Sequence, residues 1–246
     1  MMGHLDNYVV TVKLIKLVVT IAWAIVLFSC FGATANARWK DADLEWALKR
    51  DRDGIQVFLT KVPGSKFRAI LSIMEVEAST EQLAALVMDL DNCSNWAAMC
   101  KSAKIIERIS AADCYVHSIN DAPFPVRDRD IVAHVQWSYD KESGYVSMRS
   151  DATPDRLPKR KGIIRVQYAS SEWHFTPRGN GMVLVESYAH VDPTGSVPAW
   201  LTNLLIVDSP YQTLKNMRKL LSTGAYSDAE VDFIQLDGHH SEADSN

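Results

Sequence analysis

The chain has 246 residues, of which 47% are hydrophobic and 23% charged, and its formal net charge is −4. This is the composition of an ordinary globular protein, and the length fits one large domain or two small ones. The chain is slightly acidic and has no block of like charges, which argues against a nucleic-acid-binding protein with a basic face.

The first 37 residues differ in character from the rest. Lys13 and Lys16 precede a run without charges from Leu17 to Ala37, and Ala35-Asn36-Ala37 places small residues at alternate positions at its end. This is the layout of a secretory signal peptide that is cleaved after Ala37. We therefore expect residues 1–37 to be a signal peptide and the protein to be periplasmic or secreted.

Two alternatives to cleavage stay open. The run from Leu17 to Ala37 is long enough to remain as a membrane anchor. Cys30 follows Leu27-Phe28-Ser29 and could carry a lipid, although the bulky Phe28 fits that motif poorly. After cleavage three cysteines remain, so at most one internal disulfide can form. Their spacings match no zinc motif; they are Cys93, Cys100 and Cys114.

The first half of the mature chain begins with a predicted helix over 41–50. Asp53-Gly54 then indicates a turn, and two strands are expected over 55–61 and 66–77. A helix follows, because Ser79 and Gln82 have the spacing of a capping box and the apolar residues after them recur at helical intervals.

The second half is rich in strands that are bounded by turn residues, which predicts an antiparallel meander. The expected strands are 103–110, 113–120, 129–139, 145–151, 163–175 and 181–192. One long helix is predicted over 198–221, and Pro210 should kink or divide it. From residue 224 the sequence turns acidic, so 224–246 is expected to be a flexible tail. This order of elements predicts an α+β fold in which a large antiparallel sheet is covered by the last helix.

Several segments resemble the StAR-related lipid transfer (START) family, and they are most similar to its phosphatidylcholine transfer protein-like branch. The segments are Pro123-Phe124-Pro125, Arg129-Asp130-Ile131-Val132, Lys161-Gly162-Ile163-Ile164-Arg165 and Asp192–Asn203. The resemblance covers roughly Leu44 to Leu221, and it places a lipid-binding domain over 38–223. It implies a helix-grip fold, in which a curved sheet of about nine strands surrounds the C-terminal helix and a tunnel holds one lipid. It also implies no metal, nucleotide cofactor or covalent chemistry, and the sequence lacks the common catalytic and nucleotide-binding motifs.

Arg129 is the most informative charged residue. Alternation along its strand places it on one face with Val135 and Trp137, and places Asp130 on the other. An inward-facing arginine needs a partner, because a buried unpaired charge is costly. The sequence leaves two roles open: a structural salt bridge, with Glu107 or Glu186 as the partner, or contact with a lipid headgroup. We interpret Asp130 as a structural hydrogen-bonding group.

The resemblance implies further lipid contacts. Trp96 corresponds to a family tryptophan near the tunnel wall, and the stretch before it lacks the basic and aromatic residues of the phosphocholine-binding branch. The terminal helix is apolar on several faces near its start, so it is expected to line the cavity, to touch a membrane transiently and to act as a lid hinged at 191–197. The complete set of predicted contacts is Arg129, Trp96, His117, Glu107, Val135, Trp137, Tyr188, Trp200, Leu201, Leu204 and Leu205.

These observations predict a monomer that binds a phospholipid, a fatty acid or a sterol-like molecule, and that is not an enzyme. The alternative is a helix-grip enzyme of the cyclase or hydrolase kind, with Glu107, Glu186, His117 and Arg129 as its acid–base set. It requires these groups to converge on one point of the cavity.

Overall fold

The computed structural model describes residues 44–234, apart from the side chains of Ala199 and Trp200. The expected signal peptide over 1–37 lies outside the described residues. Within 44–234 no helix has the length and apolar character needed to cross a membrane.

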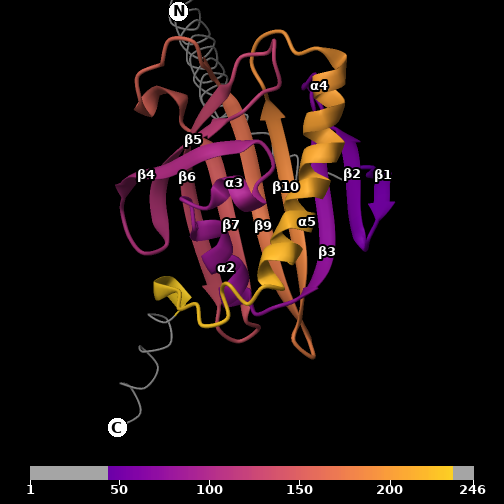
Figure 1. Cartoon of the computed structure of the whole chain (residues 1–246), viewed down its shortest axis with the longest axis vertical. Helices are drawn as coiled ribbons and strands as arrows, with labels where there is room; N and C mark the ends of the chain where they lie inside the picture. The colour runs from indigo at the N-terminus through magenta and orange to yellow at the C-terminus, as the bar shows by residue number, and fades with distance from the viewer. Residues whose placement is uncertain (1–43, 235–246) are drawn as a thin grey trace, which may run out of the picture. The chain divides into compact units, whose positions relative to one another are not determined.

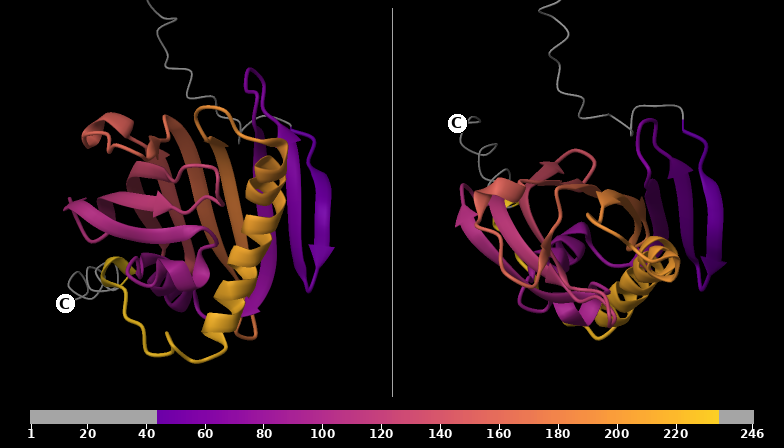
Figure 2. Two further views of the ribbon diagram at one scale, coloured as in Figure 1. Left: turned by 45° about the horizontal axis from the view of Figure 1, so that its top comes forward. Right: turned by 90° about the horizontal axis from the view of Figure 1, so that it is seen from above.

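The described residues form one large antiparallel sheet with helices on its concave side (Figures 1 and 2). The strands are β1 (Ala47–Arg52), β2 (Ile55–Lys61), β3 (Arg68–Glu77), β4 (Cys100–Arg108), β5 (Asp113–Asn120), β6 (Arg129–Asp140), β7 (Tyr145–Ala152), β8 (Ile164–Arg165), β9 (Tyr168–Gly179) and β10 (Met182–Asp192). Their order across the sheet is β1-β2-β3-β10-β9-β7-β6-β5-β4, and β8 pairs in parallel with β6. The predicted α+β class, with a curved sheet of about nine strands, is confirmed.

Within residues 44–234 the α-helices are α2 (Thr80–Met88), α3 (Cys93–Trp96), α4 (Ala199–Asn203) and α5 (Ser209–Leu221), and Pro154–Arg156 forms a 3-10 turn. The predicted capping box is present: the Ser79 hydroxyl accepts the Gln82 N–H, and the Gln82 side chain accepts the Ser79 N–H. Seen from above, the sheet curves around α2, α3 and α5 (Figure 2).

The predicted long terminal helix is divided, as Pro210 suggests. A π-helical turn, Leu204–Asp208, separates α4 from α5, and Pro210 lies in the first turn of α5. Proline has no N–H to donate to the preceding turn, so the regular hydrogen-bond ladder is interrupted there.

The predicted helix over 41–50 is wrong for its described part, because residues 47–52 form β1. Asp53 and Gly54 both have positive φ, 55° and 68°, as a two-residue hairpin of the primed type requires. This turn places Arg52 opposite Ile55 and pairs β1 with β2. The predicted strand over 163–175 is in turn interrupted between β8 and β9.

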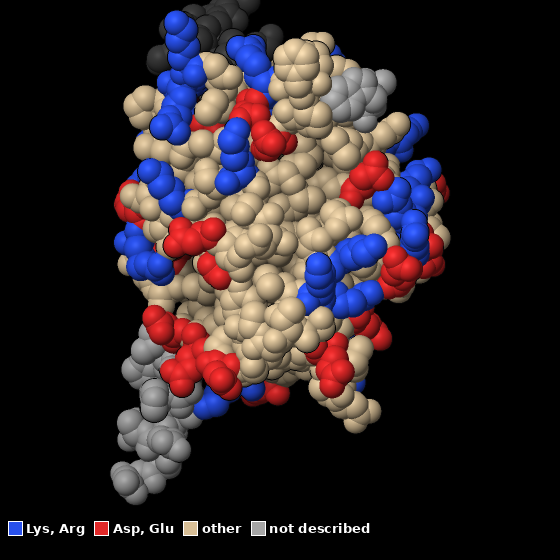
Figure 3. Space-filling model, in the orientation of Figure 1, with Lys and Arg blue, Asp and Glu red and all other residues tan. Residues whose placement is uncertain are grey.

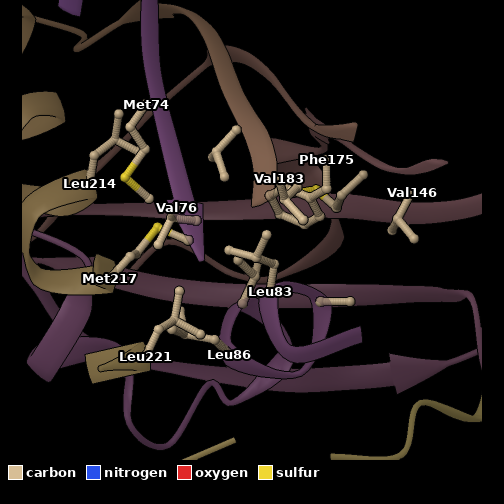
Figure 4. Packing of buried hydrophobic residues seen from close by; sticks show 14 of the residues in the cluster. Met74, Val76, Leu83, Leu86, Val146, Phe175, Val183, Leu214, Met217 and Leu221 are labelled. Atoms are coloured by element: carbon tan, nitrogen blue, oxygen red, sulfur yellow. The ribbon is translucent and has the colours of Figure 1, made fainter. Parts of the chain in front are cut away.

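The core lies between the concave face of the sheet and the helices. Leu214 and Met217 of α5 pack near Met74 and Val76 of β3, and Leu83 of α2 lies below Val183 and Phe175 (Figure 4). Because inward and outward residues alternate along each strand, these positions fix which face of every strand is internal.

The part of the C-terminal tail that the structure describes is packed against the domain, where a flexible segment was expected. Val231, Phe233 and Ile234 are buried in the same core. Three large apolar side chains spaced among acidic residues are enough to hold the segment, because each gains roughly 1.5–3 kcal/mol on burial.

Candidate functional site

A cavity of about 240 Å³ lies between the sheet and the two short helices α2 and α3. Its walls come from the end of α2, from α3 and from the concave faces of β4, β5, β6, β7 and β9. The lining is largely apolar, and its polar side chains are Arg108, Ser118 and Asn120. A larger depression of about 740 Å³ lies near the C-terminal end of α5, but it is a surface hollow beside Glu75, Glu77 and Arg218. The cavity beneath the sheet has the more apolar lining and is therefore the better candidate for an apolar ligand.

Three of the predicted contacts lie in the cavity wall. Val135 and Trp137 point inward from β6, as their alternation predicted, and Trp96 lines the cavity from α3. The Trp96 ring packs edge-on against Trp173 of β9, with the ring centroids 6.3 Å apart. Aromatic and aliphatic side chains thus form most of the surface that a ligand would meet.

Three other predicted contacts lie on the outer face of the sheet, so the prediction that they face the cavity is wrong. His117 pairs with Val132 in the register between β5 and β6, on the face opposite Val116. Glu107 is turned outward by a register shift between Ile105 and Glu107, and it binds Arg156 in an exposed ion pair.

Tyr188 is the third, because Val183 and Val185 are the inward residues of β10. Burial, together with the nearby carboxylate of Glu186, raises the pKa of Tyr188 to about 12. Its hydroxyl donates to Glu186 at 3.2 Å. Glu186 therefore also points away from the cavity and is not a partner for Arg129.

Three predicted contacts from the terminal helix do not line the cavity: Leu201, Leu204 and Leu205. Leu201 is buried, and Leu204 and Leu205 are half-buried in the π-helical turn. The side chain of Trp200 lies outside the described residues. In the described part of the chain, the helical wall of the cavity is built by α2 and α3.

Arg129 faces inward, as predicted, and is buried at the end of β6. It lies directly opposite Asn120 of β5, which does line the cavity. One of its nitrogens, Nη1, donates to the Arg127 carbonyl at 2.6 Å. Within residues 44–234, neither its Nε and Nη2 groups nor the buried Asn120 Nδ2 has a hydrogen-bond partner.

Burial, and then the nearby positive charge of Arg127, lower the pKa of Arg129, although a guanidinium remains charged at neutral pH. A buried N–H without a partner costs about 1–3 kcal/mol, and more when it is charged. Of the residues with these unpaired donors, Asn120 and Trp96 line the cavity, whereas Arg129 is not part of the lining and lies opposite Asn120.

Asp130 is a structural group, as interpreted from its place on the outer face. Its Oδ1 accepts from Arg165 Nε at 3.0 Å and its Oδ2 from Arg165 Nη2 at 2.8 Å, and His117 Nε2 lies 2.9 Å from the same Oδ2. Burial opposes ionisation of Asp130, but the hydrogen bonds from Arg165 and His117 outweigh it and hold the pKa of Asp130 below its ordinary value. Arg165 also donates to the carbonyls of Pro154 and Leu157, so this buried group fixes the loop before β8.

Two cysteines that line the cavity form a disulfide, Cys93–Cys100, across the segment that carries Trp96. Cys114 is free and buried, and it lines the same cavity. The described residues hold no cluster of side chains suited to a metal ion. The sequence allowed one disulfide but could not choose the pair.

Asn120 and Cys100 are among the site residues that sequence reasoning missed. The signal that could have found them is their place beside Arg129 in the sheet. Cys100 pairs with Asn120, and Asn120 pairs with Arg129, at the ends of neighbouring strands. To predict this pairing from the sequence, one would need to know where the bulges in β4 lie and how long the β5–β6 loop is.

Comparison with known proteins agrees with this architecture. Residues 35–223 match the START domain family. The chain belongs to the START family.

Relatives are found among bacterial and animal START proteins. An uncharacterized Pseudomonas aeruginosa protein is 35% identical over 188 residues, which covers 76% of this chain and 90% of that protein. Mouse phosphatidylcholine transfer protein is 25% identical over 180 residues, covering 71% of this chain and 83% of the relative. The crystal structure of a STAR-related lipid transfer protein from Xanthomonas axonopodis has 30% identity and a TM-score of 0.66, covering 72% of this chain and 98% of that one.

The acid–base set of the enzymatic alternative is not brought together. Glu107, Glu186 and His117 lie on the outer face of the sheet, while Arg129 faces inward. No point in the cavity is within hydrogen-bond reach of all four groups, as general acid–base catalysis by this set would require.

Proposed function

We propose that this START protein binds a single lipid in the cavity, without catalysing a reaction on it, and carries or senses that lipid in the cell envelope. The observation that carries the proposal is an apolar cavity lined at one end by Asn120, which neighbours Arg129, both with unpaired buried N–H groups. Family members that are named lipid transfer proteins support the same class of ligand.

The apolar wall sets the affinity. A tail of about 16 carbons gains at most roughly 13 kcal/mol on leaving water, at ~0.8 kcal/mol per methylene. Hydrogen bonds to one or two polar groups add only about 1–3 kcal/mol each. We assign the choice of headgroup to Arg129 and Asn120, and an anionic or strongly accepting group is favoured because their unpaired groups are N–H donors.

Location in the envelope is part of the proposal. It is supported by the signal-peptide layout of residues 1–37, and by the Cys93–Cys100 disulfide, because disulfides persist mainly in oxidising compartments. Sequencing the N-terminus of the protein purified from the envelope fraction tests the expected cleavage after Ala37. Recovery of an uncleaved chain would contradict it.

Membrane contact is proposed at the end of the domain that carries the β5–β6 loop and the loop before β8. Phe124 is 95% exposed there, and the run Lys159-Arg160-Lys161 is exposed in the second loop. The two loops are joined where Ile164 N–H donates to the Asp128 carbonyl at 2.9 Å. Lys and Arg side chains are present at this upper end, and also along both sides of the domain (Figure 3). An aromatic ring beside cations suits an anionic membrane surface.

Lipid binding is tested by native mass spectrometry of the mature protein after incubation with vesicles of mixed bacterial lipids. We expect one bound lipid per chain. Ala103→Phe should abolish binding, because Ala103 lines the cavity. Ser102→Phe is the matched control, because Ser102 is exposed and pairs with the outward residue Ile119. Absence of lipid from the wild-type protein, or unchanged binding by Ala103→Phe, would contradict the proposal.

A further inference from the structure

The segment after α5 folds back across the domain and packs beside the cavity. It leaves α5 near Gly224, passes the end of α2, and reaches the sheet wall on the β4–β6 side (Figure 1, yellow). The Tyr226 hydroxyl donates to Asp89 Oδ2 at 2.7 Å and accepts from Asn92 Nδ2 at 3.0 Å. These two bonds fasten the segment between α2 and α3, the helices that form the cavity wall.

The far end of the segment rests on a cavity-lining residue. The ring centroids of Phe233 and Trp137 are 5.5 Å apart, and the angle between the ring planes is 31°. Trp137 lines the cavity together with Ala111 and Val135, and these residues pack against the core cluster that contains Phe233. Phe233 is only 5% exposed. The segment therefore backs the wall of the cavity on this side.

This segment lies beyond the part of the chain that matches the START family, which ends at residue 223. It is also held differently from the other walls. The sheet strands are joined by ladders of hydrogen bonds, whereas the segment is held by Tyr226 and by the buried Val231, Phe233 and Ile234. Its detachment would expose these three apolar side chains but would break no strand pairing and no part of α5, and elements that move are drawn from the less stable parts of a fold.

The cavity of about 240 Å³ falls below the range of about 300–1,000 Å³ that is usual for ligand sites. A cavity of this size must widen to hold a whole lipid, so part of its wall has to move. We propose that residues 226–234 are a strap that closes the cavity, and that release of Phe233 from Trp137 opens it for lipid exchange. This inference rests on the proposed lipid binding and names the element that regulates it.

The strap is tested by measuring how fast a fluorescent, NBD-labelled phospholipid leaves the loaded mature protein for excess vesicles. Phe233→Ala should raise the release rate at least tenfold, because it removes the contact with Trp137. Tyr226→Phe should raise it less, because it removes only the hydroxyl that contacts Asp89 and Asn92. Val146→Ala is the control: Val146 is buried in the same core, but it lies on β7 and does not line the cavity.

The outcomes separate the strap from lipid binding itself. If the wild-type protein takes up no lipid, the proposed function fails before the strap is tested. If it binds lipid, but Phe233→Ala releases it at the wild-type rate or no faster than Val146→Ala, the strap is wrong and lipid binding stands.

A second measurement does not depend on any substitution. Hydrogen exchange of the loaded wild-type protein, with and without vesicles, should show faster exchange at 226–234 during transfer, while the amides of α5 remain protected. Loss of protection in α4 and α5 with an unchanged strap would instead identify the terminal helix as the lid.

Discussion

Asn120 and Arg129 lie directly opposite each other at the ends of β5 and β6, and within residues 44–234 each has a buried N–H group without an acceptor. One residue further along β6, Asp130 faces the other way and is fully paired with Arg165 and His117. The two faces of β6 thus differ in whether their buried charged groups have partners. On the outer face, Asp130 is paired with Arg165 and His117. On the inner face, Arg129 has N–H donors without an acceptor.

This pairing predicts the effect of Asn120→Asp. The new carboxylate would lie opposite Arg129 and accept its unpaired N–H groups, and hydrogen bonds to charged groups contribute about 1.5–3 kcal/mol. We expect the free energy of unfolding to rise by about 1–2 kcal/mol in urea titrations. Affinity for an anionic lipid should fall about tenfold or more, because the carboxylate occupies the donors and repels the headgroup.

Asn120→Leu and Arg129→Leu complete this test. Asn120→Leu removes the amide without adding a charge, so it should weaken anionic lipid binding less than Asn120→Asp does. Arg129→Leu should change the preference among headgroups more than it changes stability. If Arg129→Leu unfolds the protein, Arg129 is a structural residue. If neither substitution alters the preference for lipid headgroups, the headgroup site lies elsewhere.

The outer charge group predicts a loss of stability in Asp130→Asn. The substitution leaves the guanidinium of Arg165, which is 1% exposed, without its counter-charge. Removing one partner of a buried ion pair costs about 3–5 kcal/mol. Urea unfolding should show a loss of this size. Asp113→Asn is the control, because Asp113 belongs to a more exposed contact with His134, and its loss should cost less than about 1 kcal/mol.

The same group predicts a pH dependence. The folded pKa of Asp130 is held below its ordinary value near 3.8, so its ionised form stabilises the fold at pH values above the unfolded pKa. That contribution is lost as the pH falls through the lowered folded pKa. The difference in unfolding free energy between wild type and Asp130→Asn should be constant from about pH 5 to 7 and shrink below about pH 4. A difference that persists unchanged at pH 2 would contradict this assignment.

The sequence was sufficient for the family, the sheet and the inward face of β6, because these depend on alternation and on motifs of several residues. It was insufficient where one residue shifts the register. The irregularity between Ile105 and Glu107 turns Glu107 outward, and simple alternation cannot anticipate a bulge. Tyr188 was misplaced for another reason: both faces of β10 carry apolar residues, so the pattern does not identify the inner one.

Local propensity also failed where tertiary contacts decide the structure. Residues 47–50 have a helical composition, but the Asp53-Gly54 turn pairs them with β2. The acidic composition after residue 224 suggested a loose tail, and yet Phe233 packs on Trp137. In both segments a few specific contacts outweigh the average preference of the sequence.

The exposed loops at one end predict how the protein meets a membrane. Replacing Lys159, Arg160 and Lys161 together by Gln should weaken binding to anionic vesicles roughly 100-fold at low salt, at about 1 kcal/mol per cation. Phe124→Ala should weaken binding at all salt concentrations, because the ring enters the interface. Vesicle sedimentation measures both effects.

A charge-matched control tests whether the position of the cations matters. Arg178, Lys215 and Lys219 are exposed on the β9–β10 hairpin and on α5. Their replacement by Gln changes the net charge equally but leaves the two loops intact. An equal loss of vesicle binding in this control would mean that net charge, rather than the loop surface, governs the contact.

The Cys93–Cys100 disulfide predicts a coupling between stability and the shape of the cavity. It closes a short loop, with a sequence separation of 7, for which chain entropy predicts about 2–3 kcal/mol of stabilisation. The double variant with Ala at both positions should lose that amount in urea unfolding. Lipid affinity should fall as well, because Trp96 lies within the loop and its wall position is no longer fixed.

Cys114→Ala distinguishes the disulfide from a general effect of losing cysteine. Cys114 is buried and lines the same cavity, but its thiol is free. Its replacement removes one small apolar group and should cost about 1 kcal/mol or less. Thiol titration of the unfolded mature protein should find one reactive group before reduction and three afterwards. Three reactive groups before reduction, or equal losses in the two variants, would mean that the Cys93–Cys100 bond does not stabilise the wall that carries Trp96.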